Sequence, residues 1–285
     1  MAITTGADLA AGSVAMVGAA RYTYEHDAVF TNTVNKMTIG QGEKSVYLPK
    51  FGTVSVDDLI DGVDMSNSQT MTITGTTHTT DEAGAKVIVT KKLRNQLKEP
   101  AFRAAGKVIG NAMGKKLDQD GLTLYSGLDS GLGSAGTTFT LGHVLAGVTQ
   151  CKGQAEPVPW PMVFVAHPYI LHILIDKFSD PATSNFPEQY MLDTLKDYWV
   201  GNVKLYNLPV LGDGNITIDS EIDSYGAIYS KEAFIYVVSY EPENWVVYDD
   251  SLRGWELGIV HDYKMVEEDG TYGRYMYFDT PTPTS

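Results

Sequence analysis

The sequence predicts an α+β fold in which strands dominate both halves of the chain and one long helix separates them. Residues 69–74 alternate apolar and polar side chains, the period of a strand that has one covered face. After Pro100 the apolar residues recur at a spacing typical of a helix. From residue 203 onward, short runs rich in β-branched and aromatic residues alternate with turn residues.

The composition is that of a folded protein, and it limits the function classes. The chain has 285 residues, 43% of them hydrophobic and 20% charged, so it can form one large domain or two modest ones. The net charge of −14 argues against sequence-specific DNA recognition, because phosphate binding depends on Lys and Arg. The single cysteine, Cys151, excludes an intrachain disulfide. The N-terminus lacks the features of a signal peptide, and no apolar run approaches the ~20 residues that span a bilayer. We therefore expect a soluble protein without a membrane partner.

The first 91 residues are expected to form an arm and then a long excursion. Residues 1–36 have little core of their own, with a short helix expected between residues 21 and 34. Residues 37–91 are expected to form a two-stranded ribbon, with strands at 37–39, 45–48, 53–56, 69–74 and 86–90 around an acidic turn at 57–68. A ribbon of two strands is marginally stable in water, so we expect it to lie across an adjacent copy of the chain.

The clearest helix is predicted to run from Pro100 to about Tyr125. Proline suits the first helical turn, where its missing N–H costs nothing. The apolar side is expected to contain Ala101, Phe102, Ala105, Val108, Ile109, Ala112, Met113 and Leu117. Three glycines four residues apart form a stripe along this helix: Gly106, Gly110 and Gly114. Each costs about 1 kcal/mol of helix propensity relative to alanine, so the stripe indicates either close packing or a bendable helix.

The remaining residues are predicted to form an α/β subdomain followed by strands. The glycine-rich residues 127–138 are expected to be a flexible linker at a domain boundary. A helix at 141–151, a buried strand at 161–166 and a helix at 168–178 are expected after it. Later strands are expected at 207–211, 216–218, 226–229, 234–238, 245–248, 255–266 and 271–278. Asp269-Gly270 indicates a hairpin between the last two of these strands.

The sequence contains no pattern that supports catalysis, a cofactor or a metal. Residues 131–136 match the letters of the GxGxxG dinucleotide motif, but a helix is predicted before them and none opens on the last glycine, so a linker is the preferred interpretation. His167 and His172 are five residues apart and do not share a helix face as a zinc pair would. The turn at 213–215 lacks the terminal glutamate of a calcium loop. We predict that the protein is not an enzyme.

The charged residues are segregated along the chain. Residues 51–85 contain six acids and no Lys or Arg, whereas residues 86–116 contain nine bases and one acid. An acidic ribbon tip that reached a neighbour's basic helix would be attracted to it. The side chains expected at this contact between subunits are Asp57, Asp58, Asp61, Asp64, Lys91, Lys92, Arg94, Lys98, Arg103 and Lys107. The alternative is two independently solvated faces.

The order of these parts resembles that of tailed-bacteriophage major capsid proteins with the Hong Kong ninety-seven shell fold. Residues 116–127 look like the end of the spine helix of that family, and residues 162–168 look like the entry from strand to helix in its axial domain. Residues 208–211 and 226–234 look like later axial-domain strands. The resemblance covers nearly the whole chain.

The resemblance implies a division of the chain and a function. Residues 1–36 would be the N-terminal arm, 37–91 the extended β loop, 92–138 the peripheral domain with its spine helix, 139–243 the axial domain, and 244–285 the return strands and tail. Such subunits form the hexamers and pentamers of an icosahedral head shell around double-stranded DNA, without sequence specificity. Scaffold, portal and decoration proteins are possible partners, and the expected location is the virion, after assembly in the host cytoplasm. The alternative is a β-rich virion binding module, such as a tail tube or decoration protein.

Overall fold

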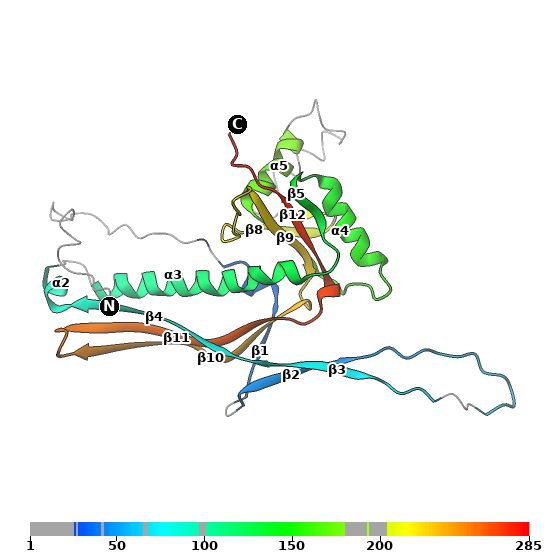
Figure 1. Cartoon of the computed structure of the whole chain (residues 1–285), viewed down its shortest axis with the longest axis horizontal. Helices are drawn as coiled ribbons and strands as arrows, with labels where there is room; N and C mark the ends of the chain where they lie inside the picture. The colour runs from blue at the N-terminus through cyan, green and yellow to red at the C-terminus, as the bar shows by residue number, and fades with distance from the viewer. Residues whose placement is uncertain are drawn as a thin grey trace.

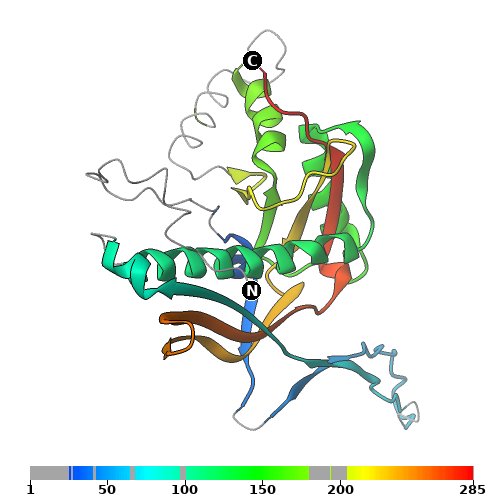
Figure 2. The same cartoon turned by 60° about the vertical axis from the view of Figure 1, so that its left-hand side comes forward.

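The computed structural model describes residue 26 and residues 28–40, 43–64, 68–96, 101–179, 193 and 204–284, without the side chains of 101–104 and 177–179. These residues form a body built on two sheets, from which a two-stranded ribbon projects (Figures 1 and 2). The ribbon consists of β2 (Ser45–Phe51) and β3 (Ile73–Thr79), which run antiparallel.

The first sheet of the body has four strands and is covered by the long helix. Its order is β1 (Asn35–Thr38), β10 (Phe234–Asp249), β11 (Gly254–Glu267) and β4 (Asp81–Thr90). Helix α3 (Ala101–Leu122) lies along β11 and β4 (Figure 1), and α2 (Lys91–Gln96) follows β4 directly. Ile109 of α3 packs against Leu93, Val89 and Leu257, which gives this sheet a small core.

The second sheet has six strands and separates two hydrophobic cores. Its order is β5 (Leu132–Thr138), β12 (Gly273–Asp279), β9 (Asp223–Ser230), β6 (Met162–Ala166), β8 (Leu208–Gly212) and β7 (Lys204–Leu205). The side chains of β6 alternate between faces. Met162 and Phe164 join the core under α4 (Leu141–Gly153) and α5 (Pro168–Ser179), whereas Val165 joins the core on the other face.

That second core joins the two sheets at the C-terminal end of α3. Phe30 of α1 (Phe30–Thr33) packs against Tyr125 of the 3-10 helix η2 (Thr123–Gly127), Tyr229 of β9 and Phe234 of β10. The Tyr229 hydroxyl lies 2.6 Å from Thr33 Oγ1 and 3.2 Å from the Tyr125 hydroxyl, so the buried polar groups here are paired. The short α1 is thereby fixed to the body.

Most of the predicted elements are confirmed, but several boundaries in the N-terminal part are wrong. The predicted helix at 21–34 is limited to α1 among the described residues. Residues 53–56 are not a strand, and β3 begins at Ile73 rather than at 69. The predicted strand at 86–90 belongs to β4, which pairs with β11 of the body. The two-stranded ribbon therefore spans residues 45–79, and Pro100, which was expected to start α3, lies outside the described residues.

Two predictions about turns are also wrong. Residues 132–138, expected in a flexible linker, form β5, which runs parallel to β12. Gly133 permits this because its φ is +84° and a Cβ there would lie 2.3 Å from the Phe278 ring. Asp269-Gly270 does not close a hairpin: β11 pairs with β10 and β4, whereas β12 pairs with β9 and β5. The 3-10 helix η3 (Gly270–Tyr272) instead carries the chain from one sheet to the other.

Two further differences concern strands near the C-terminus. Residues 216–218 were expected to form a strand but make only one isolated bridge, between Ile218 and Ser224. The separate strands expected at 234–238 and 245–248 are one strand, β10, with register irregularities between Val238 and Glu243. Such irregularities bend a strand without ending it, and they account for the break in the sequence pattern.

Candidate assembly interface

Strands β2 and β3 of the ribbon keep a regular antiparallel register from end to end. Ser45 is opposite Thr79 at the base, and Phe51 is opposite Ile73 at the outer end. Gly75 lets the strands approach, since a Cβ there would lie 2.4 Å from the Leu48 carbonyl oxygen and 2.7 Å from the Tyr47 ring. The Tyr47 ring covers this glycine from the opposite strand, an arrangement that stabilises a pair of strands.

The base of the ribbon is attached to the body by one face of β2. Val46 and Leu48 pack against the core formed by Ile39, Ile235, Val237 and Val266. Lys50, on the same face, forms an ion pair with Asp269 at the crossover between the sheets. Burial acts to raise the pKa of Asp269, but the hydrogen bonds from Lys50 and Thr271 outweigh it and hold that pKa below its ordinary value. The same hydrogen bond raises the pKa of Lys50.

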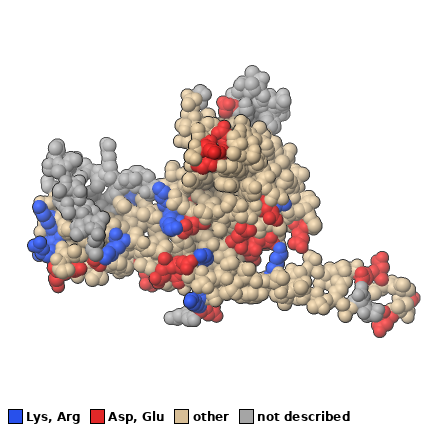
Figure 3. Space-filling model, in the orientation of Figure 1, with Lys and Arg blue, Asp and Glu red and all other residues tan. Residues whose placement is uncertain are grey.

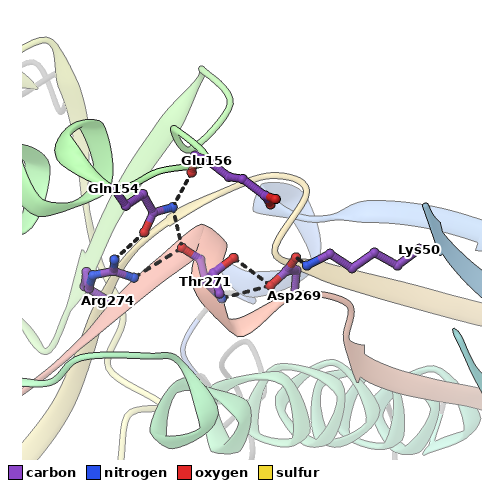
Figure 4. Close-up of polar contacts among 6 residues, drawn as sticks. All are labelled: Lys50, Gln154, Glu156, Asp269, Thr271 and Arg274. Atoms are coloured by element: carbon purple, nitrogen blue, oxygen red, sulfur yellow. Dashed lines mark hydrogen bonds and ion pairs between the residues drawn. The ribbon is translucent and has the colours of Figure 1, made fainter. Parts of the chain in front are cut away.

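Asp269 is itself held by the turn that follows it (Figure 4). Its Oδ1 accepts hydrogen bonds from Thr271 N at 3.0 Å and from Thr271 Oγ1 at 2.7 Å. The Thr271 carbonyl accepts in turn from Arg274 Nη1 and from Gln154 Nε2. Arg274 also donates to Gln154 Oε1. The carboxylate that Lys50 meets is therefore fixed by η3, β12 and Gln154, the residue that follows α4.

Beyond Phe51 the ribbon leaves the body and becomes irregular (Figures 1 and 2). Gly52 N donates to the Thr72 carbonyl. The Gln69 side chain accepts a hydrogen bond from Ser55 N and donates one to Ser55 Oγ. Large apolar side chains are exposed to solvent along this outer half. The most exposed is Val56, which is 97% accessible. The others are Phe51, Val54, Leu59, Ile60, Val63, Met71 and Ile73. Exposed apolar surface of this extent is typical of an interaction site.

The charged residues predicted at a subunit contact lie at opposite ends of the molecule. Asp57, Asp58, Asp61 and Asp64 are exposed at the tip of the ribbon, where acids gather in Figure 3. Lys91, Lys92 and Arg94 are on α2 and Lys107 is on α3, at the far end of the body. Arg94 also lies 4.5 Å from the Trp255 ring centre, a cation–π contact. Lys98 and the side chain of Arg103 are outside the described residues. The structure thus separates the two charged groups within one chain.

The glycine stripe of α3 faces away from the sheet. A Cβ built at Gly106, Gly110 or Gly114 would meet no described atom within 4 Å. The buried side of the helix carries Ile109 and Met113, whereas Val108, expected on the apolar side, is 48% exposed. Among the described residues the stripe has no packing partner in its own chain, so its predicted packing role remains open for contact with another chain.

Neither a metal-binding cluster nor a membrane-spanning helix is found in the part of the chain that the structure describes. No three His, Cys, Asp or Glu side chains there gather closely enough to hold a metal ion. None of the described helices is both long and apolar enough to cross a membrane. A cavity of about 510 Å³ lies at the end of α3, but its one charged side chain, Asp120, is bound by Lys116 and Tyr263. Tyr125 and Tyr225 are the other titratable residues of its described lining, which contains no histidine, cysteine or lysine.

Comparison with solved structures identifies the fold. The chain is similar to the structure of Mycobacterium phage Che8, with a TM-score of 0.72 and 12% identity over 90% of this chain and 93% of that one. It is also similar to the capsid structure of the cyanophage P-SCSP1u, with a TM-score of 0.70 and 12% identity over 94% and 93% of the two chains. The head structure of Helicobacter pylori bacteriophage KHP40 matches with a TM-score of 0.68 and 9% identity over 87% of each chain. No protein-family model and no curated protein sequence matches the chain.

These similarities show the fold, and they confirm the predicted α+β phage major-capsid shell fold with its extended loop and spine helix. Sequence reasoning missed the attachment of the ribbon by Lys50 and Asp269. A signal was present, because Val46, Leu48 and Lys50 alternate along one strand and must share a face. No feature of the sequence indicated that Asp269 would be the partner of Lys50.

Proposed function

We propose that the protein is the major capsid protein of a tailed bacteriophage, a structural subunit and not an enzyme. The observation that carries this proposal is the ribbon. Its outer half exposes apolar and acidic side chains to water although the body behind it has the fold of phage capsid and head structures. A segment with this surface gains stability when another molecule covers it, and a shell of identical subunits supplies such a molecule at every position.

In this proposal each part of the chain has a place in the shell subunit. Residues 1–36 form the arm, 37–91 the extended loop, 92–138 the peripheral domain, 139–243 the axial domain, and 244–285 the return strands and tail. The pairing of β12 with β9 adds residues 273–279 to the sheet of the axial domain. The subunits form hexamers and pentamers of a head shell that encloses DNA, in a virion assembled in the host cytoplasm, where scaffold, portal and decoration proteins are further partners.

The contact between subunits follows from the separation of charges. The acidic tip cannot meet the bases of α2 and α3 in its own chain, because they lie at opposite ends of the molecule (Figure 3). In a neighbouring copy, however, the basic end is accessible, and opposite charges would fix the position of the tip there. The apolar side chains around the acids then supply the buried area. The exposed glycine stripe of α3 is a second candidate contact, since it allows close approach of another backbone.

Electron microscopy of the purified full chain tests the proposal. Closed shells or rings of five or six subunits support it. Tubes would favour the alternative, a virion binding module such as a tail tube protein. Particles that remain monomeric at high concentration and in the presence of other head proteins would contradict the proposal and would favour a decoration module.

A further inference from the structure

A buried aspartate at the end of α3 holds the arm side of the chain to the body. Asp118 is fully buried. Its Oδ1 accepts hydrogen bonds from the backbone N–H groups of Val29 at 2.9 Å and Phe30 at 2.8 Å, at the start of α1. Its Oδ2 accepts from Asn215 Nδ2 at 2.8 Å. One carboxylate thus links α1, α3 and the turn at 213–215; we call this group the arm junction.

A second carboxyl group is buried at the arm junction. Asp213 is 1% exposed, and its Oδ1 accepts the N–H of Asn215 at 2.8 Å. Its Oδ2 has no donor among the described residues. Asn215 joins the two carboxyls, because its N–H donates to Asp213 and its side-chain amide donates to Asp118. Two ionised carboxylates buried close together repel each other, so a proton or a cation must offset one of the two charges.

We propose that Asp213 carries a proton which it donates to the Asp118 carboxylate, and that this proton makes the arm junction a pH-dependent fastening of residues 28–34 to the body. The proton satisfies the unpaired oxygen of Asp213 and removes one of the two buried charges. It needs no ligand beyond the groups that the junction contains. The fastening is a property of the single chain, so it holds whether or not the protein forms a shell.

Two phenols and two imidazoles are the other titratable groups near Asp213. Tyr125 of η2 and Tyr229 of β9 pack on the junction, and burial raises the pKa of both phenols, so they stay neutral. The His26 ring lies beside Gly214, where a Cβ would come within 2.5 Å of it. His167 precedes α5, and burial lowers its pKa. Asp118 is the carboxylate that shares the donor Asn215 with Asp213.

The direction of the pH dependence follows from linkage. Burial, followed by the hydrogen bond with Asp118, raises the pKa of Asp213 to about 7. In an open junction this carboxyl would titrate at about pH 4. Opening the junction between these two values therefore releases a proton, so the equilibrium constant for opening rises by up to about tenfold per pH unit and levels off above pH 7. The fastening is tightest in acid.

Hydrogen exchange of the Val29 and Phe30 amides in the full chain measures this opening. After correction for the intrinsic pH dependence of exchange, protection in the wild type should fall by up to about tenfold per pH unit between about pH 5 and pH 7. In Asp213→Asn the amide donates in place of the proton and does not titrate, so protection should not change with pH. Glu221→Gln removes an exposed carboxyl from the turn at 219–222 and should keep the wild-type slope.

Three results would overturn the proposal. One is constant protection in the wild type, and another is an unchanged slope in Asp213→Asn. The third is protection that rises when calcium or magnesium is added and falls with a chelator, since a metal ion would then lie between the carboxyls. If Asp213→Asn does not fold, the infrared band of a protonated carboxyl in the wild type decides: it should be present at pH 6 and lost by pH 9.

Discussion

Lys50 of β2 and Asp269 of the crossover turn form an ion pair that fixes the ribbon to the junction of β11 and β12. Only 8% of the Asp269 side chain is exposed, and Thr271 orients it, so the body determines where Lys50 must lie. The ribbon therefore leaves the body in a direction set within its own chain. Its outer half, beyond Phe51, then extends away from the body (Figure 1). The segment is not folded back onto its own chain, as self-assembly through the ribbon requires.

Removing this ion pair should change the acid stability of the protein. Lys50→Gln is expected to lower the free energy of unfolding at pH 7 by at most about 1 kcal/mol, because Lys50 is half exposed to solvent. The pKa of Asp269 is held below its ordinary value, so the stabilisation is present above about pH 4 and is lost as the pH falls through that lowered pKa. Urea unfolding at pH 7 and at pH 2 measures both effects. Lys44→Gln, which removes another exposed lysine, is the control. If Lys50→Gln lowered the free energy of unfolding equally at pH 7 and pH 2, the ion pair would not be the cause.

Reversing the charge of the ribbon tip should impair assembly and leave the subunit folded. With Asp57, Asp58, Asp61 and Asp64 changed to lysine, the yield of shells should fall, and more at low salt than at high salt, because salt screens the repulsion from a neighbour's bases. Sedimentation measures the yield, and circular dichroism checks the fold. The matched control changes four exposed acids elsewhere to lysine: Glu43, Glu221, Glu232 and Asp250. Equal yields for both quadruple variants would remove the tip contact.

The apolar tip residues should matter for assembly and not for the stability of the subunit. Leu59→Ser and Ile60→Ser replace side chains that are largely exposed in the single chain, so the free energy of unfolding should change by less than about 0.5 kcal/mol. The concentration needed for assembly should rise several-fold, because each side chain loses apolar area that a neighbour would bury. Light scattering against subunit concentration measures this. Ile222→Ser replaces an apolar side chain that is exposed on the body, and it should leave assembly unchanged. An equal effect of Ile222→Ser would show that any exposed apolar residue matters, and it would contradict a specific contact at the tip.

A β-branched residue at Gly75 should separate the two strands of the ribbon. The side chain of Gly75→Val would lie 2.4 Å from the Leu48 carbonyl oxygen and would displace the Tyr47 ring. Hydrogen exchange of amides in 46–51 should become faster, whereas exchange in the core strands β6 and β9 should not change. Thr74→Val places a similar side chain on the adjacent residue and should keep the slow exchange. Slow exchange in both variants would mean that the strands tolerate the clash.

Helices and strands could be predicted from the sequence where their own apolar residues show the spacing of a buried face. The helix ending near 125, the strand at 161–166 and the helix at 168–178 are confirmed in α3, β6 and α5. Partners far apart in sequence were not predictable in this way. Asp269-Gly270 has the composition of a hairpin turn, but β12 has its apolar residues Met276 and Phe278 in the core under α4, so it pairs with β9 instead.

The predicted site residues show the same limit. The acidic tip and the basic end are each a local run of like charge, so the sequence could separate them, whereas their contact between subunits stays a prediction. The arm junction was beyond reach, since Asp118 and Asp213 are 95 positions apart and each looks like an ordinary helix or turn acid. Only the packing of α1 and the 213–215 turn against α3 brings the two carboxyls together.

Replacing the glycine stripe of α3 should affect the stability of the subunit and its assembly in opposite directions. Gly106→Ala, Gly110→Ala and Gly114→Ala together should raise the free energy of unfolding by about 2–3 kcal/mol, because alanine favours the helix and the added methyl groups meet no described atom. If another subunit packs on this face, the same methyl groups should raise the concentration needed for assembly. Chemical unfolding and light scattering on one triple variant measure both quantities. Ala112→Gly, exposed on the same helix, should destabilise the subunit by about 1 kcal/mol without blocking assembly. A triple variant that is more stable and assembles as well as the wild type would show that the stripe has no partner in the shell, and the glycines would then serve only to let the helix bend.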